Sequence, residues 1–153
     1  MTRIKRHKEW VWLAAFLPLL ISAAPRSYLA HDEGYYALQA RWIQDSGQWL
    51  APLWWQEPLF DRTIGVQWLI ASSQQLLGPS SWAAHMPSLL AAAGALWLTA
   101  QLAKHLIGPA QSWLSAALLA LTPLFLNYAH LASQDMPLLA LELVGILLSL
   151  IHI

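Results

Sequence analysis

The sequence predicts an all-α membrane protein, and three observations carry that prediction. Of the 153 residues, 58% are hydrophobic and only 10% are charged, whereas a soluble domain usually contains about 25% charged residues. Several apolar runs approach the roughly twenty residues that a helix needs to cross the hydrocarbon core, and short polar breaks separate them. Ten tryptophans cluster near the ends of these runs, as amphipathic rings do at the lipid headgroups. We therefore expect about four transmembrane helices and two amphipathic interfacial helices.

Charge and cysteine content exclude several functional classes. The formal net charge is zero, which argues against nucleic-acid binding, because a basic surface supplies most of that affinity. The chain contains no cysteine, so disulfides, thiolate catalysis and cysteine-ligated metal sites are excluded.

The first predicted element is a transmembrane helix over residues 10–25. Residues 1–9 carry four of the eight basic side chains, and basic residues next to a span stay on the cytoplasmic side. A cleaved signal peptide is the alternative, because positions 22–24 hold small residues, although Pro25 fits poorly after such a cleavage site. Both interpretations place the following residues outside the cytoplasm. The first interpretation predicts a plasma-membrane protein with a cytoplasmic N-terminus.

Residues 26–80 are polar enough to form an extracytoplasmic loop that contains both interfacial helices. Asp32 is placed to cap a helix over residues 33 to about 46, and a glycine directly afterwards to end it. An aromatic, proline-containing loop is expected over residues 47–58. The second interfacial helix covers residues 63–77, because a run of about fifteen residues with several Gln and Ser side chains is too short to span.

Three further transmembrane helices are predicted over residues 84–106, 112–128 and 137–153. A Gly-Pro break at 108–109 separates the first two of them. The last apolar run reaches the end of the chain without a charged flank, which predicts a truncated form of a longer protein.

The acidic residues are the candidates for chemistry. Four of the eight lie in three short polar breaks: Asp32, Glu33, Asp61 and Asp135. A charge inside hydrocarbon is costly, so acids at the ends of apolar segments indicate a polar site at one membrane surface. If residues 63–77 do not span, the order of the spans places all three breaks on the non-cytoplasmic side.

Four motifs, in the right order and spacing, make the chain resemble a family of membrane glycosyltransferases. They are Asp32-Glu33-Gly34-Tyr35-Tyr36-Ala37, Phe60-Asp61-Arg62-Thr63-Ile64-Gly65, Trp82-Ala83-Ala84-His85-Met86-Pro87-Ser88 and Ser133-Gln134-Asp135-Met136-Pro137-Leu138. The family comprises the protein mannosyltransferases and the lipid A aminoarabinose transferases (glycosyltransferase families 39 and 83), and it has the GT-C fold. Many members have Glu-Lys-Pro-Pro where this chain has Asp61-Arg62-Thr63-Ile64, so the order of charges is kept with a shorter acid and a planar cation. Family members are several times longer, and residues 1–153 are expected to be the N-terminal portion of one GT-C domain. As an isolated fragment, they are expected to form an incomplete site with little activity.

This resemblance implies transfer of a sugar from an undecaprenyl or dolichyl phosphate to a lipid or protein hydroxyl outside the cytoplasm. Asp32 is the candidate catalytic base, because an alcohol becomes a better nucleophile when a carboxylate accepts its proton. Arg62 is the candidate phosphate partner, because a guanidinium matches phosphate oxygens bidentately. Asp135 is the second candidate catalytic residue and would orient Arg62 or hold the acceptor. The remaining candidates for substrate binding are Glu33, Asp61 and Tyr36.

Other roles remain open for these residues. Asp32 and Asp135 each precede a helix and could be N-caps, each contributing about 1 kcal/mol. Asp61 and Arg62 could form a solvated ion pair at the surface. The matching functional alternative is a non-catalytic multi-pass protein (an assembly or carrier subunit) or an inactive fragment. A carrier usually places ionisable groups near the bilayer midplane, whereas here they lie at segment ends.

The cofactor is left open. A divalent metal near His31, Glu33 or Asp61 is compatible with the residue types, but their spacing assigns no ligand set. His85 and His130 are expected either to lie at the membrane interface or to make polar contacts between helices.

Overall fold

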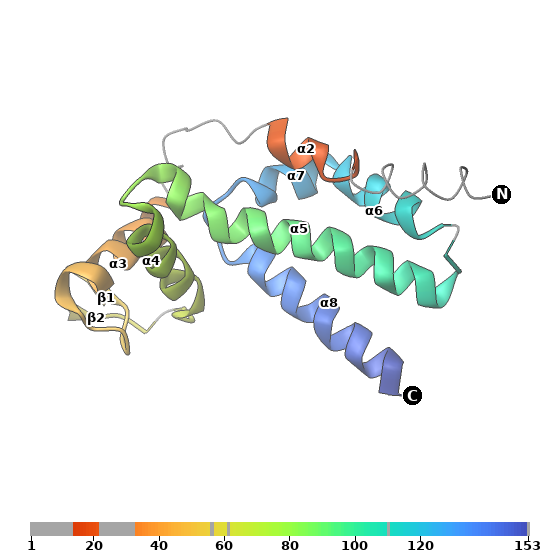
Figure 1. The fold of residues 1–153 in the computed structure, drawn as a ribbon. Helices are drawn as coiled ribbons and strands as arrows, with labels where there is room; N and C mark the ends of the chain where they lie inside the picture. The colour runs from red at the N-terminus through yellow and green to blue at the C-terminus, as the bar shows by residue number, and fades with distance from the viewer. Residues whose placement is uncertain (1–13, 22–32, 56, 61, 110, 153) are drawn as a thin grey trace.

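The computed structural model describes residues 14–21, 33–55, 57–60, 62–109 and 111–152. His31, Asp32 and Asp61 lie outside these residues. The described part is mainly helical (Figure 1). In chain order the elements are α2 (Leu17–Ile21), α3 (Glu33–Ser46), β1 (Leu53–Trp54), β2 (Glu57–Pro58), α4 (Gly65–Leu77), α5 (Ser81–Leu106), α6 (Ser112–Ala120), α7 (Pro123–Ala129) and α8 (Asp135–His152).

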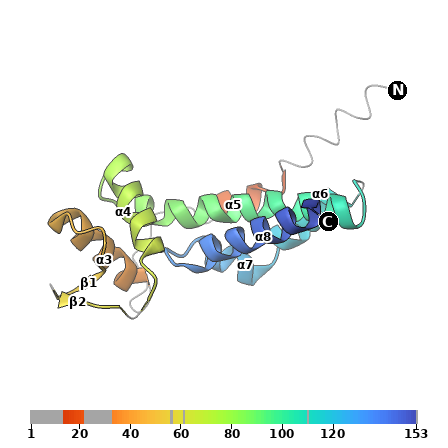
Figure 2. The same cartoon turned by 90° about the horizontal axis from the view of Figure 1, so that it is seen from below.

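The two predicted interfacial helices, α3 and α4, pack together at the N-terminal end of α5, and both views show them there (Figures 1 and 2). Helix α3 covers the residues predicted for it. It is followed directly by Gly47, whose positive φ of 69° suits glycine. Helix α4 begins two residues later than predicted and ends at Gly78, with φ of 90°. With 13 residues, α4 is about 20 Å long, less than the roughly 30 Å of a hydrocarbon core.

Residues 47–58 were expected to form a loop, and the structure corrects this prediction. They contain a short antiparallel hairpin, in which Leu53 lies opposite Pro58 and Trp54 opposite Glu57. Trp55 follows β1 with a positive φ of 52°. The segment lacks the Asn-Gly or Asp-Gly pair that marks a tight hairpin, so no local signal predicted this hairpin.

Two helices in the described residues are long and apolar enough to cross a membrane. They are α5, with 26 residues, and α8, with 18 residues. Each contains most of a predicted span but begins slightly earlier, and the Ser80 hydroxyl caps α5 by accepting a hydrogen bond from the Ala83 amide at 3.2 Å. Of the predicted first span, residues 10–25, only residues 14–21 are described, and they contain α2. The expected number of about four spans therefore stays a prediction.

The predicted continuous helix over 112–128 is broken into α6 and α7. The two helices are long and apolar enough to cross a membrane only as a pair, and they are bent by 72° at the break. Pro123 is the first residue of α7, and Thr122 before it has an extended ψ of 119°. Proline lacks an N–H and disfavours helical geometry in the residue before it, which explains the break. The pair is a broken span or a re-entrant loop, and the number of candidate spans rises to three if it counts as one.

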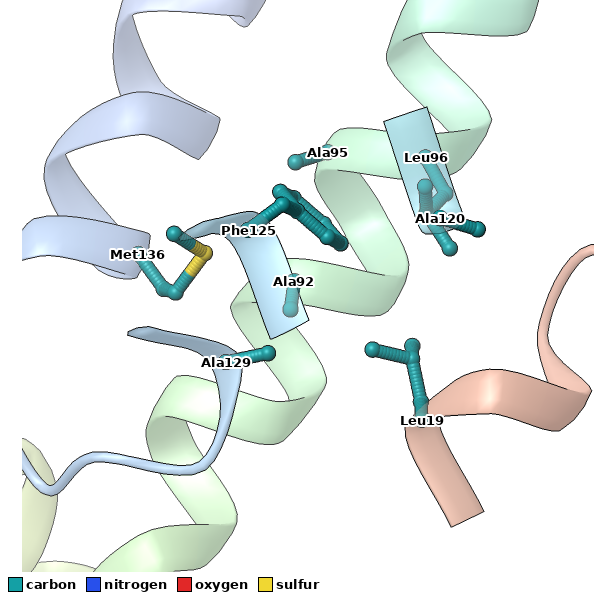
Figure 3. Close-up of a cluster of buried hydrophobic side chains, with 8 residues drawn as sticks. All are labelled: Leu19, Ala92, Ala95, Leu96, Ala120, Phe125, Ala129 and Met136. Carbon is teal, nitrogen blue, oxygen red and sulfur yellow. The ribbon is translucent and has the colours of Figure 1, made fainter. Parts of the chain in front are cut away.

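The main hydrophobic cluster forms where α5 meets α2, α6, α7 and α8 (Figure 3). Leu96 and Phe125 are its large buried side chains from α5 and α7. Alanines fill most of the remaining positions. The cluster consists of Leu19, Ala92, Ala95, Leu96, Ala120, Phe125, Ala129 and Met136. Small side chains let apolar helices approach closely, which is the usual packing of helices in membranes.

His130 joins the broken segment to α2. Its Nδ1 lies 2.8 Å from the carbonyl oxygen of Leu126, one turn earlier, and its Nε2 lies 2.8 Å from the carbonyl oxygen of Leu19. The ring is buried. The sequence-based prediction that His130 makes a polar contact between helices is therefore confirmed.

Candidate functional site

The structure brings the described residues of all three polar breaks to one end of α5. Glu33 and Tyr36 lie in the first turn of α3, Arg62 precedes α4, and Asp135 is the first residue of α8. The two remaining candidates, Asp32 and Asp61, lie outside the described residues.

Glu33 is a buried acid that joins three separate elements. Only 1% of it is exposed. Its Oε1 lies 2.9 Å from Nε2 of His85 on α5, and it accepts a hydrogen bond of 2.8 Å from the Ala132 amide between α7 and α8. These partners are 52 and 99 residues away in the sequence. The polar contact between helices that was predicted for His85 is confirmed, and its partner is a candidate site residue.

Arg62 lies against the aromatic residues of α3. Its Nη1 donates a hydrogen bond of 3.0 Å to the hydroxyl of Tyr36. Its guanidinium carbon lies 5.2 Å from the ring centre of Tyr35 and 5.5 Å from that of Tyr36, within cation–π range. Arg62 itself is exposed, whereas Tyr36 is buried. The aromatic pair therefore orients the cation and leaves it open to solvent.

Asp135 is held at the start of α8 by the residues just before it. The Ser133 hydroxyl donates a hydrogen bond of 2.7 Å to Oδ2 of Asp135. The carbonyl oxygen of Ser133 accepts a hydrogen bond of 3.2 Å from the hydroxyl of Ser88 on α5. Asp135 is exposed, and its negative charge suits the positive end of the helix dipole. A structural role at the helix start and a chemical role are both compatible with this geometry.

A cavity of about 630 Å³ lies between α4 and the start of α8. One part of its lining is polar and includes Arg62, Thr63 and Gln134. The other part is largely apolar, and its lining consists of Gly65, Val66, Leu69, Pro137, Leu138 and Leu141. A cation beside an apolar wall is the arrangement that a phosphate attached to a hydrocarbon chain requires. The sequence pointed to Arg62, but not to the cavity or to Gln134.

The residues considered for a metal are only partly described. Within the described ranges, no group of three or more His, Asp or Glu side chains is arranged to hold a metal ion. Three residues were considered for a metal, and two of them, His31 and Asp61, lie outside those ranges.

Fold and site together define a helical membrane protein of the GT-C type, and comparison with known proteins identifies its family. Residues 61–153, more than half of the chain, match the dolichyl-phosphate-mannose-protein mannosyltransferase family. The chain belongs to this family of glycosyltransferases.

Individual relatives agree with this assignment. The chain is 27% identical over 116 residues to the undecaprenyl phosphate-alpha-4-amino-4-deoxy-L-arabinose arabinosyl transferase of Shewanella sediminis. The match covers 72% of this chain and 21% of that protein. ArnT from Cupriavidus metallidurans has the same fold in its apo state, with a TM-score of 0.83 and 21% identity over 95% of this chain and 28% of ArnT. ArnT bound to undecaprenyl phosphate gives a TM-score of 0.83 and 20% identity over 92% of this chain and 26% of ArnT. The chain thus spans about a fifth of the curated relative's length.

Proposed function

We propose that the protein takes part in transferring a glycosyl group from a polyprenyl phosphate to a hydroxyl of a lipid or protein. The reaction would take place at the extracytoplasmic face of the plasma membrane, with the N-terminus of the chain in the cytoplasm. The observation that carries the proposal is the cavity between α4 and α8, where Arg62 lies beside an apolar wall. The relative from Shewanella sediminis is named for undecaprenyl phosphate-linked aminoarabinose, and ArnT has been solved with undecaprenyl phosphate bound. Both support a lipid-phosphate donor here.

In the proposed reaction the candidate residues act on the acceptor, the leaving phosphate or each other. Asp32 accepts the proton of the acceptor hydroxyl while that oxygen bonds to the anomeric carbon of the sugar. The bond from this carbon to the phosphate oxygen breaks, and Arg62 stabilises the charge that develops on the leaving phosphate. Asp61 and Asp135 orient Arg62 or hold the acceptor. The hydroxyl of Tyr36 already accepts a hydrogen bond from Arg62, so Tyr36 contributes by fixing the cation that meets the donor.

Binding of undecaprenyl phosphate to the purified chain in lipid nanodiscs tests the central step. A hydrogen bond to a charged group contributes about 1.5–3 kcal/mol, so Arg62→Ala is expected to weaken binding by about 10- to 100-fold. Arg41→Ala is the matched control, because Arg41 is an exposed cation on α3 whose ion pair with Asp45 lies outside the cavity. Equal affinities for both variants would contradict the role of Arg62.

Transfer itself is measured with a radiolabelled polyprenyl-phosphate sugar in membranes that contain the protein. Running the assay with and without a chelator shows whether a divalent metal takes part. Labelled product that accumulates only with the wild-type chain supports the proposal. A chain that binds the lipid phosphate but yields no product would limit the function to donor binding.

A further inference from the structure

The buried carboxylate of Glu33 has a second consequence for the site. A charged group away from water is strongly destabilising unless it is paired and hydrogen-bonded. Here one oxygen has two partners, Nε2 of His85 and the amide of Ala132, both within 2.9 Å. Because both partners lie far from α3 in the sequence, the carboxylate is satisfied only when α3, α5 and the segment between α7 and α8 are assembled.

His85 completes this arrangement on the α5 side. Its Nδ1 faces the carbonyl oxygen of Ser81 on the preceding turn, while its Nε2 faces Glu33. The imidazole therefore fixes Glu33 relative to the start of α5.

The three partners lie next to the residues proposed to act in transfer. Glu33 is bonded to Asp32, and consecutive Cα atoms are only about 3.8 Å apart. Ala132 lies three residues before Asp135 and two before Gln134, which lines the cavity beside Arg62. A single side chain therefore links the polypeptide that carries Asp32 to the segment that carries Asp135.

We propose that Glu33 and His85 are positioning residues, which hold the two ends of the site at a fixed separation and touch neither donor nor acceptor. This inference rests on the proposed transfer function. It replaces direct substrate binding as the role of Glu33, because a side chain that is 1% exposed presents almost no surface to a substrate.

Two measurements separate positioning from binding. Glu33→Ala is expected to lower kcat by about 100-fold, the size of effect that a displacement of about 1 Å produces, while KM for the polyprenyl-phosphate sugar stays unchanged. His85→Ala should behave in the same way, and His85→Gln, which keeps an N–H donor for Glu33, should recover most of the activity. Because His85 acts through its contact with Glu33, the double variant Glu33→Ala/His85→Ala should lose no more activity than Glu33→Ala alone.

Amide hydrogen exchange tests the contact between Glu33 and the Ala132 amide independently of transfer activity. The Ala132 amide donates to Glu33, so Glu33→Ala should speed exchange in residues 131–134 by at least about tenfold. Asp45→Ala is the matched control, because Asp45 is an exposed acid near the other end of α3 that pairs with Arg41 on the surface, and it should leave this exchange unchanged. If Glu33→Ala does not accumulate in membranes, Glu33→Gln retains an acceptor oxygen but removes the charge, and a smaller change in the same direction is expected.

The outcomes are distinct. Unchanged exchange in residues 131–134, a raised KM for the donor in Glu33→Ala, or unchanged kcat despite faster exchange would each overturn the positioning role. An intact enzyme that contains this chain and shows no transfer activity would instead refute the proposed function, while the exchange experiment would still decide whether Glu33 holds this segment.

Discussion

Two regions of the molecule pack through different kinds of contact. Around the middle of α5, the packing is apolar and depends on alanines with a few large side chains such as Leu96 and Phe125 (Figure 3). Between α3 and α4, buried amides are part of the interface. The side-chain amides of Gln39 and Gln67, both fully buried, meet at 2.7 Å, and Gln44 donates to the carbonyl oxygen of Ala71 at 2.7 Å.

This difference indicates how the two regions divide stability and function. Apolar packing is tolerant of sliding, whereas buried polar groups are satisfied in only one arrangement and so define it. The candidate site lies at the polar end, where α3, α4 and the starts of α5 and α8 meet (Figures 1 and 2). We therefore expect changes at the polar end to affect activity more than stability, and changes in the alanine-rich cluster to do the reverse.

The largest effect expected at the polar end is that of Asp32→Asn. A positioned general base contributes about 10²–10⁴-fold, so transfer should fall by about 1,000-fold while insertion into membranes and thermal unfolding stay close to wild type. A radiolabelled-donor assay measures the first quantity, and circular dichroism in detergent measures the second. Full activity of the asparagine variant would remove Asp32 from the mechanism.

In the alanine-rich cluster, Leu96→Ala should do the opposite. Leu96 is fully buried, and truncating such a leucine costs about 2–5 kcal/mol of unfolding free energy. The loss is measured by titration with a denaturing detergent. The matched control is Leu90→Ala, because Leu90 lies on the same helix and is 64% exposed. Equal losses for both variants would contradict the description of this cluster as the stabilising core.

A smaller effect is expected between α3 and α4. Gln39→Ala should cost about 1–3 kcal/mol, because it leaves the buried amide of Gln67 without its partner. Replacing both amides, in Gln39→Leu/Gln67→Leu, should cost less than Gln39→Ala alone, because no polar group then stays unsatisfied. The same detergent titration ranks the two variants. A double variant less stable than the single one would show that shape, rather than hydrogen bonding, governs this interface.

Much of the helical architecture could be predicted, because its signals are local. A glycine with positive φ ends both α3 and α4, and such glycines are visible in the sequence. Pro123 is a local signal for the bend between α6 and α7. The continuous apolar run around it nevertheless led to the prediction of a single helix. The hairpin had no such signal, because its turn uses Trp55 rather than glycine or asparagine.

The site was predictable only to the level of its segments. The predicted order of the spans places the three polar breaks on one face, and the structure places the described members of those breaks at one end of α5. The partners of Glu33 were not predictable, because nothing in the local sequence marks an amide 99 residues away as a hydrogen-bond donor. For the same reason, Gln134 became a candidate only when α4 and α8 were seen to share a cavity.

The His130 ring shows how a membrane protein can interrupt a helix without exposing bare peptide groups to lipid. The His130 amide bonds to the carbonyl of Asn127, one residue short of the helical pattern, so the carbonyl of Leu126 loses its usual donor. The carbonyl of Leu19 lies in α2. One imidazole lies 2.8 Å from each oxygen, so a ring N–H can take the place of a missing amide donor. A helix break next to hydrocarbon is thus tolerated where a side chain supplies the hydrogen bond that the backbone no longer makes.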